Sequence, residues 1–268
     1  VENGIDWFLS RANGFFAIAI INEDNGDLIL ARDRFGIKPL VYTKINDTLI
    51  FSSEIKGLLE SGLVEAEFRS DKVEEYLSYR FILEPDTFFG GVNQIESGTY
   101  HIYDDQGIKA VRRYWDVPNT KDFSIENEED VIRELSDKVV SAVRDWAITD
   151  VPLGAFLSGG LDSSLTSAIL CQDIKDLKTY TIGYSEKGFN EFEFAKKVSI
   201  HIGSEHMELN DDLNSYNENW DKLIALKDAP LSVPNEVPLA VMCDELRKDI
   251  TVVISGEGAD ELFGGYGK

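Results

Sequence analysis

The feature that most constrains this chain is an apolar segment that leads directly into two glycines and then into a helix. Residues 151–158 read VPLGAFLS, Gly159 and Gly160 follow, and LDSS opens a segment with helical spacing. A strand that turns on glycine into a helix leaves the first backbone N–H groups of that helix unpaired at the end of a sheet. The segment therefore predicts a parallel α/β fold with an anion site at this turn.

Strand and helix patterns alternate through the second half of the chain. Strand patterns cover 151–158, 177–184, 205–210 and 250–256. Helix patterns cover 129–148, 161–172, 190–203, 220–229 and 239–247. This alternation predicts a doubly wound parallel sheet, in which ligands bind beyond the carboxyl ends of the strands.

The first half has a different pattern, in which short strands follow one another with turns between them. Apolar or β-branched runs at 15–22, 27–32, 39–43, 48–52, 98–103 and 108–115 predict antiparallel pairing, with the last two joined as a hairpin across 104–107. The polar, acidic stretch 119–130 buries little and separates the two patterns. We therefore expect an antiparallel α+β domain over 1–118 and a parallel α/β domain over 119–268.

Charge and cysteine content exclude several classes of function. The chain has 26 basic and 49 acidic residues, a net charge of -23, which argues against a protein that binds nucleic acid over a broad face. The chain has no run of about 18 apolar residues, and its first residues, VENGIDWFLS, lack a basic segment, so we expect neither a membrane span nor a secretion signal. Its 2 cysteines have no metal-binding spacing. We expect a cytoplasmic protein with small-molecule ligands and neither nucleic-acid nor membrane partners.

The turn at 158–164 has the chemistry of an anion cradle. Glycine amides and serine hydroxyls can donate to phosphate oxygens there, and the helix terminus adds partial positive charge. The candidate residues are Ser158, Gly159, Gly160, Ser163 and Ser164. The turn lacks the lysine of one common phosphate loop and the glycine spacing of the dinucleotide-binding motif. The alternative is a Gly-Gly turn capped by Ser158 with no ligand.

Two acidic residues predict a divalent cation. Asp162 lies in the first turn of the helix, where it would repel phosphate unless it held Mg²⁺. A second strand, 250–256, leads into the loop SGEGADELFGGY, which contains Asp260. If the two strands are neighbours, Asp162 and Asp260 face one crevice and can share metal ions. The alternative is that both acids are simply solvated at the rim.

These two loops carry a family resemblance. SGGLDSS together with SGEGADELFGGY resembles the PP-loop (ATP pyrophosphatase) synthetase half of glutamine-dependent asparagine synthetases. GFFAIAIINEDNGDLILARDRFGIKPLVY and FSSEIKGLL resemble the later part of that family's glutaminase domain, which has the N-terminal nucleophile (Ntn) hydrolase fold. The resemblance therefore implies an Ntn-hydrolase-like antiparallel portion, followed by a PP-loop domain of the adenine nucleotide alpha hydrolase type.

The resemblance implies an AMP-forming ligase. ATP adenylates the side-chain carboxylate of aspartate, pyrophosphate leaves into the cradle, and ammonia from glutamine attacks the acyl-adenylate. Leu157, Ile182, Ser255 and Gly256 are then expected to contact the nucleotide, and Glu257 to handle the proton of the incoming ammonia. A homodimer is compatible with this resemblance.

The chain also departs from the family pattern. The family's glutaminase begins with a nucleophilic cysteine, whereas residue 1 here is Val1. The glutamine-binding segments expected before GFFAIAI, and a catalytic lysine expected after the GGY loop, are absent. We expect this chain to be a piece of a longer bifunctional enzyme. Two alternatives remain: a relative that amidates another carboxylate, or a protein that binds nucleotide without turnover.

Overall fold

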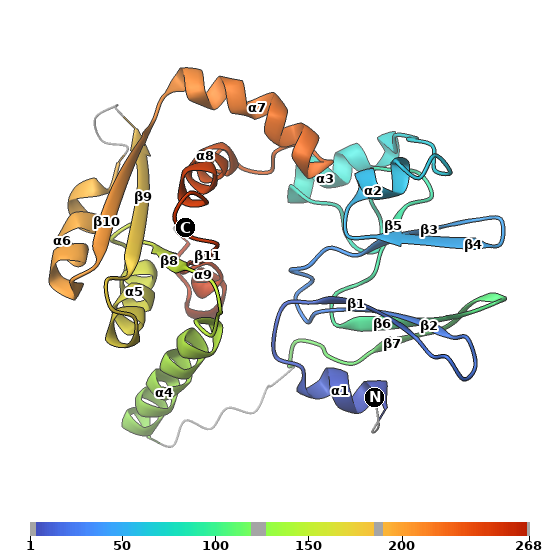
Figure 1. Cartoon of the computed structure of the whole chain (residues 1–268), viewed down its shortest axis with the longest axis horizontal. Helices are drawn as coiled ribbons and strands as arrows, with labels where there is room; N and C mark the ends of the chain where they lie inside the picture. Colours follow the sequence, from blue (N-terminus) through green and yellow to red (C-terminus); the bar gives the residue numbers. More distant parts are fainter. Residues whose placement is uncertain (1–3, 119–126, 185–189, 267–268) are drawn as a thin grey trace. The chain divides into compact units, whose positions relative to one another are not determined.

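A computed structural model describes residues 4–118, 127–184 and 190–266 of the chain (Figure 1). The chain divides into two compact units. The first is Val1–Lys121 with Asp228–Ser232, and the second is Asp122–Lys227 with Val233–Lys268. The predicted boundary at 118/119 borders residues 119–126, which lie outside the described residues, so the boundary itself stays a prediction.

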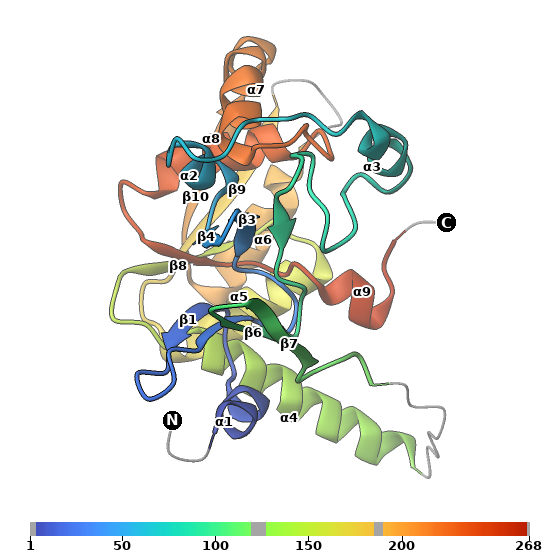
Figure 2. The ribbon, with the colours of Figure 1, turned by 90° about the vertical axis from the view of Figure 1, so that its right-hand side faces the viewer.

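The first unit contains two antiparallel sheets. Its strands are β1 (Ala17–Ile21), β2 (Leu28–Arg32), β3 (Val41–Ile45), β4 (Thr48–Ser52), β5 (Asn93–Gln94), β6 (Thr99–Asp104) and β7 (Gly107–Arg113). One sheet has the order β1-β2-β6-β7 and the other β4-β3-β5, and they stack one over the other (Figures 1 and 2). The core between them contains Leu30, Leu40, Ile95 and Tyr103. The predicted antiparallel α+β fold is confirmed.

Besides the strands, the part of the first unit that the structure describes contains three short helices and one 3₁₀ turn. They are α1 (Ile5–Arg11), α2 (Ile55–Leu59), the turn η1 (Ser70–Lys72) and α3 (Val73–Tyr79). Leu9 of α1 and Leu58 of α2 are fully buried against the strands. Burial of one side of each helix stabilises segments that are too short to be helical alone.

A pair of buried charges fixes the connection that follows β2. The Arg32 guanidinium is 5% exposed and forms an ion pair with Glu84 at 2.6 Å. The Asp33 carboxylate is 1% exposed and accepts hydrogen bonds from four backbone N–H groups, those of Phe16, Phe35, Ile37 and Lys38. Because Arg32 and Asp33 both have partners, these two buried charges have a structural role.

A buried histidine lies in the same unit. His101 on β6 is 2% exposed, with Nε2 2.9 Å from Glu96 Oε2 and Nδ1 3.1 Å from the Tyr103 hydroxyl. The ring of Tyr42 on β3 packs edge-on against it. Burial lowers the pKa of His101, although the charge of Glu96 acts in the opposite direction. The folded unit therefore resists protonation of this ring.

We expect this histidine to make stability depend on pH. In the unfolded chain the His101 ring takes up a proton near pH 6.5, whereas in the folded chain it does so only at lower pH. The unfolded state therefore binds more protons below pH 6.5, and the free energy of unfolding falls as the pH is lowered. The free energy of unfolding, measured with denaturant at pH 7.5 and 5.5, should decrease between these pH values in the wild type. In His101→Gln the decrease should be smaller by about 1 kcal/mol. The exposed His201 supplies the control His201→Gln. Equal losses in the wild type and His101→Gln would contradict the account.

The second unit contains a four-stranded parallel sheet. Its strands are β8 (Leu153–Phe156), β9 (Lys178–Tyr184), β10 (Glu205–Asp211) and β11 (Val252–Ile254). The order is β10-β9-β8-β11, and every pairing is parallel. Helices cover both faces of this sheet (Figure 1). The predicted doubly wound α/β fold is confirmed.

Six helices lie in the described residues of the second unit. They are α4 (Glu128–Trp146), α5 (Leu161–Asp173), α6 (Phe192–Ile202), α7 (Leu213–Lys227), α8 (Glu236–Leu246) and α9 (Ala259–Phe263). On one face Ala155 packs with Leu170 of α5, and α4 lies against α5; on the other face Tyr180 packs with Met242 of α8. Within the part of the chain that the structure describes, no helix has the length and apolar character to cross a membrane.

The largest differences from the sequence expectation concern two helices, while α8 begins three residues before the predicted 239–247. The predicted helix 220–229 begins earlier, at Leu213, because the Asp212 carboxylate caps it by accepting hydrogen bonds from the backbone N–H groups of Asn214 and Ser215, each at 2.9 Å. The loop after β11 contains the short helix α9, which the sequence patterns did not indicate.

Candidate nucleotide-binding site

The glycine turn lies between β8 and α5, as the sequence predicts. Gly159 has a φ of 84°, a left-handed conformation that favours glycine, and Gly160 is the N-cap of α5 without a side-chain cap. The side chain of Leu157 is fully buried. Its backbone N–H donates to the Tyr180 carbonyl at 2.8 Å, and its own carbonyl accepts from the Thr181 hydroxyl. The neighbouring strand thus holds the start of the turn.

Two of the three predicted hydroxyl donors bind each other. The Ser158 and Ser163 hydroxyls are 2.9 Å apart, and Ser163 Oγ also accepts from the Ser158 backbone N–H at 3.2 Å. The Gly160 backbone N–H donates to Ser158 Oγ at 3.2 Å. These bonds fix the shape of the turn. The Ser164 hydroxyl differs, because its oxygen is buried and has no hydrogen-bond partner among the described residues.

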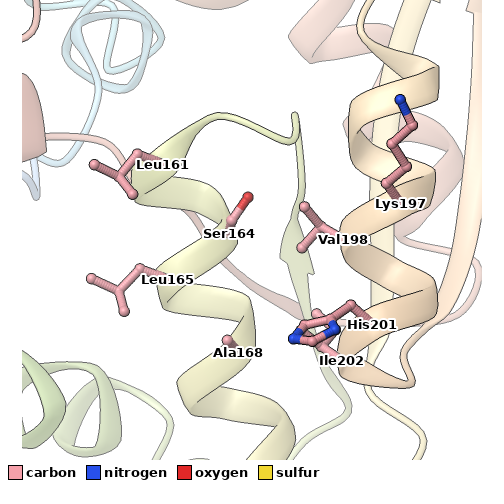
Figure 3. A pocket seen from close by; sticks show the side chains of 8 residues that line it. All are labelled: Leu161, Ser164, Leu165, Ala168, Lys197, Val198, His201 and Ile202. Atoms are coloured by element: carbon pink, nitrogen blue, oxygen red, sulfur yellow. The ribbon is translucent and has the colours of Figure 1, made fainter.

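Ser164 faces a groove between α5 and α6 (Figure 3). The groove has a volume of about 400 Å³. Its lining residues are Leu161, Ser164, Leu165, Ala168, Lys197, Val198, His201 and Ile202. Most of these side chains are apolar, so the groove itself does not suit a phosphate group. The candidate anion site is therefore the turn above it and not the groove.

The turn packs directly on the first turn of α6. A Cβ atom built on Gly159 would lie 2.5 Å from Phe194 Cβ and 2.6 Å from the Ala195 backbone nitrogen. No side chain fits at that distance. The sequence did not indicate this role of α6, because Gly159 and Phe194 are 35 positions apart in the chain.

The second glycine loop lies against the first. Strand β11 pairs with β8 in parallel, with Ile254 opposite Ala155, so both loops leave the same edge of the sheet. A Cβ atom built on Gly256 would lie 3.0 Å from the Ser163 backbone nitrogen and 3.1 Å from Asp162 Cβ. This confirms the expectation that the two loops meet at one edge.

The acidic residues of the second loop differ in exposure. Glu257 is exposed, and its backbone N–H donates to Ser255 Oγ at 3.3 Å. Asp260 is half-buried in the first turn of α9, and the backbone of Gly265 folds back onto its carboxylate. Glu261 accepts a hydrogen bond from the Tyr266 hydroxyl, which lowers the pKa of Glu261. The contacts of Gly265 and Tyr266 thus hold the end of this loop against the first turn of α9.

The donor set suits Mg²⁺ only in part. Carboxylate oxygens such as those of Asp162 and Asp260 are the ligands that Mg²⁺ prefers. Among the residues described, no three Asp, Glu, His or Cys side chains are grouped closely enough to hold a metal ion by themselves. A site built on these two acids would therefore take its remaining oxygens from phosphate and water, as Mg²⁺ sites at nucleotides commonly do.

Ile182 lies on the opposite face of the sheet from α5. Its half-buried side chain packs on the cluster that contains Tyr180 of β9 and Met242 of α8. Alternation along β9 places Tyr184 on the same face, closer to the carboxyl end of the strand. Ile182 thus borders the edge where the two loops meet, but on the α8 side.

Fold and site together define the class of this protein: a parallel α/β fold with a glycine turn and an acidic loop at the carboxyl ends of adjacent strands. The family model described as asparagine synthase matches residues 134–268, and that of the glutamine amidotransferase domain matches residues 1–115. The chain therefore belongs to the asparagine synthase family.

Several known proteins are similar to this chain. A glutamine-hydrolysing asparagine synthetase of Bacillus subtilis is 36% identical over 96% of this chain, which spans 40% of that protein. The amidase chry2 of Gibberella zeae is 29% identical over 97% of this chain and 41% of its own length. The solved glutamine-dependent NAD⁺ synthetase of Acinetobacter baumannii, in complex with ADP, has a TM-score of 0.39 and 14% identity, covering 98% of this chain and 64% of that one.

Proposed function

We propose that this chain contributes the nucleotide-binding part of a ligase that converts aspartate to asparagine with ATP and glutamine. The observation that carries the proposal is the contact of Gly256 with Asp162 and Ser163, which joins a glycine turn and an acidic loop at one sheet edge. The aspartate side-chain carboxylate attacks the α-phosphorus of ATP, and pyrophosphate leaves. Ammonia then forms the C–N bond as AMP departs, and the nitrogen loses a proton.

The turn is suited to stabilise the departing pyrophosphate. The α5 terminus presents backbone N–H groups that have no partner within the helix, and its dipole favours negative charge. The Ser158–Ser163 hydroxyl pair holds the turn in one shape, so little reorganisation is needed when charge develops. Ser164, whose hydroxyl faces the apolar groove between α5 and α6, would contribute through its place in the first turn of α5 and not through its side chain.

Asp162 and Asp260 would hold Mg²⁺ against the phosphates. The ion, when bound, neutralises charge on the leaving pyrophosphate. Asp162 lies in the first turn of α5 and Asp260 in the first turn of α9, so each of the two joined loops contributes one carboxylate. Without a cation, both would repel the triphosphate.

Glu257 is the candidate for accepting the proton released when ammonia attacks. It lies in the loop that contacts the first turn of α5, and its exposed carboxylate can pass a proton to water. Leu157, Ile182 and Ser255 would border the nucleoside. For Leu157 this contact would involve the backbone, because the side chain is fully buried.

The first unit would supply the ammonia as part of a glutamine-hydrolysing domain, in line with the amidotransferase match over residues 1–115. A second candidate function is the amidation of a different carboxylate, because the sequence similarity extends to a protein that is not named an asparagine synthetase, the amidase chry2. For either function we propose a cytoplasmic protein that binds neither nucleic acid nor membrane, and a homodimer is compatible with both.

The test is a product analysis with a panel of acceptors. The intact protein, given ATP, Mg²⁺ and ammonium, should release AMP and pyrophosphate in equal amounts only when aspartate is present. Turnover with another carboxylate in place of aspartate would select the second function. Release of ADP would contradict the adenylation mechanism, and ATP binding without any turnover would indicate a nucleotide-binding protein that is not an enzyme.

A further inference from the structure

A short segment between two helices of the second unit is part of the first unit. Helix α7 ends at Lys227 and α8 begins at Glu236. By its contacts the segment 228–232 belongs to the first unit, whereas the residues on both sides of it belong to the second. The chain therefore passes here from the second unit into the first and back again. We call residues 228–232 the strap.

Asp228 anchors the strap at the start of α2. Its side chain is 16% exposed, and its Oδ2 accepts a hydrogen bond from the Lys56 backbone N–H at 3.3 Å and lies 3.6 Å from Lys56 Nζ. Lys56 is in the first turn of α2, where backbone N–H groups need acceptors from outside the helix. Among the described residues, the N-cap residue Glu54 makes no capping hydrogen bond through its side chain. Asp228 thus caps a helix that lies 172 positions earlier in the chain.

Tyr76 of α3 holds the other end of the strap. Its hydroxyl donates to the Pro230 carbonyl at 2.8 Å and lies 3.5 Å from the Ser232 hydroxyl. The tyrosine ring packs against Phe88, which is 8% exposed, with the ring centroids 5.2 Å apart. Because the ring is held by the interior of the first unit, its hydroxyl is presented to the strap in one position. The strap is therefore anchored on two different helices of the first unit.

The residues that flank the strap connect it to the sheet of the second unit. The Glu236 carboxylate forms an ion pair with Lys227 at 2.6 Å and accepts a hydrogen bond from the Val233 backbone N–H at 3.1 Å. These contacts hold the end of α7 next to the start of α8. Met242 of α8 then packs in the cluster that Ile182 of β9 also joins. Because packed elements transmit displacements, a movement of the strap would reach the sheet face that borders the proposed nucleotide site.

The chemistry of ammonia makes a tie between the two units useful. In the proposed function the first unit hydrolyses glutamine to glutamate and ammonia, and the second unit uses the ammonia to form a C–N bond. Ammonia that enters water near neutral pH takes up a proton, and the ammonium ion has no lone pair with which to attack the acyl-adenylate. Ammonia is used efficiently only if its source and its acceptor are held together.

We propose that Asp228 and Tyr76 are positioning residues that tie the ammonia-forming unit to the ligase unit through the strap, so that ammonia from glutamine reaches the acyl-adenylate before it meets water. This rests on the proposed function, because it takes the first unit as the source of ammonia. Both residues act through the link between the units and not on a reacting atom. Synthesis with glutamine therefore depends on the strap, whereas synthesis with added ammonium does not.

The test compares glutamine with ammonium as the nitrogen source. The intact protein is given ATP, Mg²⁺ and aspartate, and the released glutamate and asparagine are both measured. Asp228→Gly removes the carboxylate and suits the φ of 56° at this position. It should raise the ratio of glutamate to asparagine at least about fivefold and keep the ammonium-dependent rate within about twofold of the wild type.

Two milder variants support the same test if Asp228→Gly does not fold. Tyr76→Phe removes the hydroxyl that binds the strap but keeps the ring on Phe88, and it should raise the ratio in the same direction. Asp228→Asn loses the charge but keeps an oxygen that can cap α2, so its ratio should lie between those of the wild type and Asp228→Gly.

Asp176 supplies the matched control. It has the same φ of 56° as Asp228, but its side chain is 64% exposed and it lies outside the strap, in the turn before β9. Asp176→Gly should leave the ratio of glutamate to asparagine unchanged. Hydrogen exchange at the Lys56 backbone amide reports docking of the strap without any assay of activity. It should be at least about tenfold faster in Asp228→Gly than in the wild type, and unchanged in Asp176→Gly.

Each other result has a distinct meaning. An unchanged ratio in both Asp228→Gly and Tyr76→Phe overturns the proposal. Loss of ammonium-dependent synthesis in these variants also overturns it, because the strap would then serve the ligase site itself. Loss of glutamine hydrolysis measured without ATP would show that the strap only stabilises the first unit, which likewise overturns the proposal. If the wild type forms no asparagine even with ammonium, the proposed function fails and the coupling role fails with it, while exchange at Lys56 still reports whether the strap is docked.

Discussion

Replacing Asp162 with asparagine is expected to slow AMP release at least about a hundredfold. The amide has the same shape as the carboxylate but no charge, so it binds Mg²⁺ weakly and leaves the charge of the pyrophosphate less compensated. No described residue donates a hydrogen bond or forms an ion pair to the Asp162 side chain, so the fold should be little affected. The assay follows AMP from ATP, aspartate and ammonium, and calorimetry follows the Mg²⁺ dependence of ATP binding.

The same helix provides the matched control. Asp173 at the other end of α5 forms an exposed ion pair with Arg144 at 2.7 Å. Such pairs contribute little, so Asp173→Asn should keep AMP release within about twofold of the wild type. Full turnover in Asp162→Asn, with an unchanged Mg²⁺ dependence, would remove Asp162 from the proposed metal site.

Replacing Gly159 with alanine is expected to lower the free energy of unfolding by about 2–4 kcal/mol and to abolish ATP binding. Two costs add here. The φ of 84° is unfavourable for any residue with a Cβ atom, and that atom would lie 2.5–2.6 Å from the backbone and Cβ of α6. Backbone atoms cannot move aside as a flexible side chain can. Denaturant unfolding and calorimetric titration with ATP measure the two effects.

Gly160 is the natural comparison because it is the adjacent glycine in the same turn. Its φ is -68°, and a Cβ atom there would meet only Ser158 Oγ at 3.3 Å. Gly160→Ala should therefore cost about 1 kcal/mol or less, as expected for an alanine at an N-cap. Equal destabilisation by the two substitutions would show that the packing of Gly159 on α6 is not what fixes the turn.

The parallel sheet and its loops could be predicted from local patterns. The apolar strand before Ser158 and the acids after Gly256 indicate strand ends and ligand chemistry without any knowledge of tertiary structure. Their meeting at one edge followed from the general rule for parallel sheets. A local pattern does not show which strands are neighbours. The packing of Gly256 on Asp162 depends on β11 lying beside β8, and only the structure shows this pairing.

Other features were beyond sequence reasoning for the same physical reason. Hydroxyl groups were expected to point at an anion, yet Ser158 and Ser163 bond to each other, because five residues of a strand-to-helix turn bring them within 2.9 Å. The earlier start of α7 depends on Asp212 as a cap, whereas the apolar spacing in the sequence indicates a helix only from Trp220 onward.

The most direct measurement is a titration of the isotopically labelled protein with Mg²⁺ and pyrophosphate, followed through its backbone amide signals. If the two loops close on one ligand, the signals of Gly159 and Ser163 in the first loop and of Gly256 and Gly258 in the second should shift together, with one dissociation constant. Asp162→Asn should weaken both sets equally. Shifts confined to one loop, or two sets with different dissociation constants, would contradict a shared phosphate site.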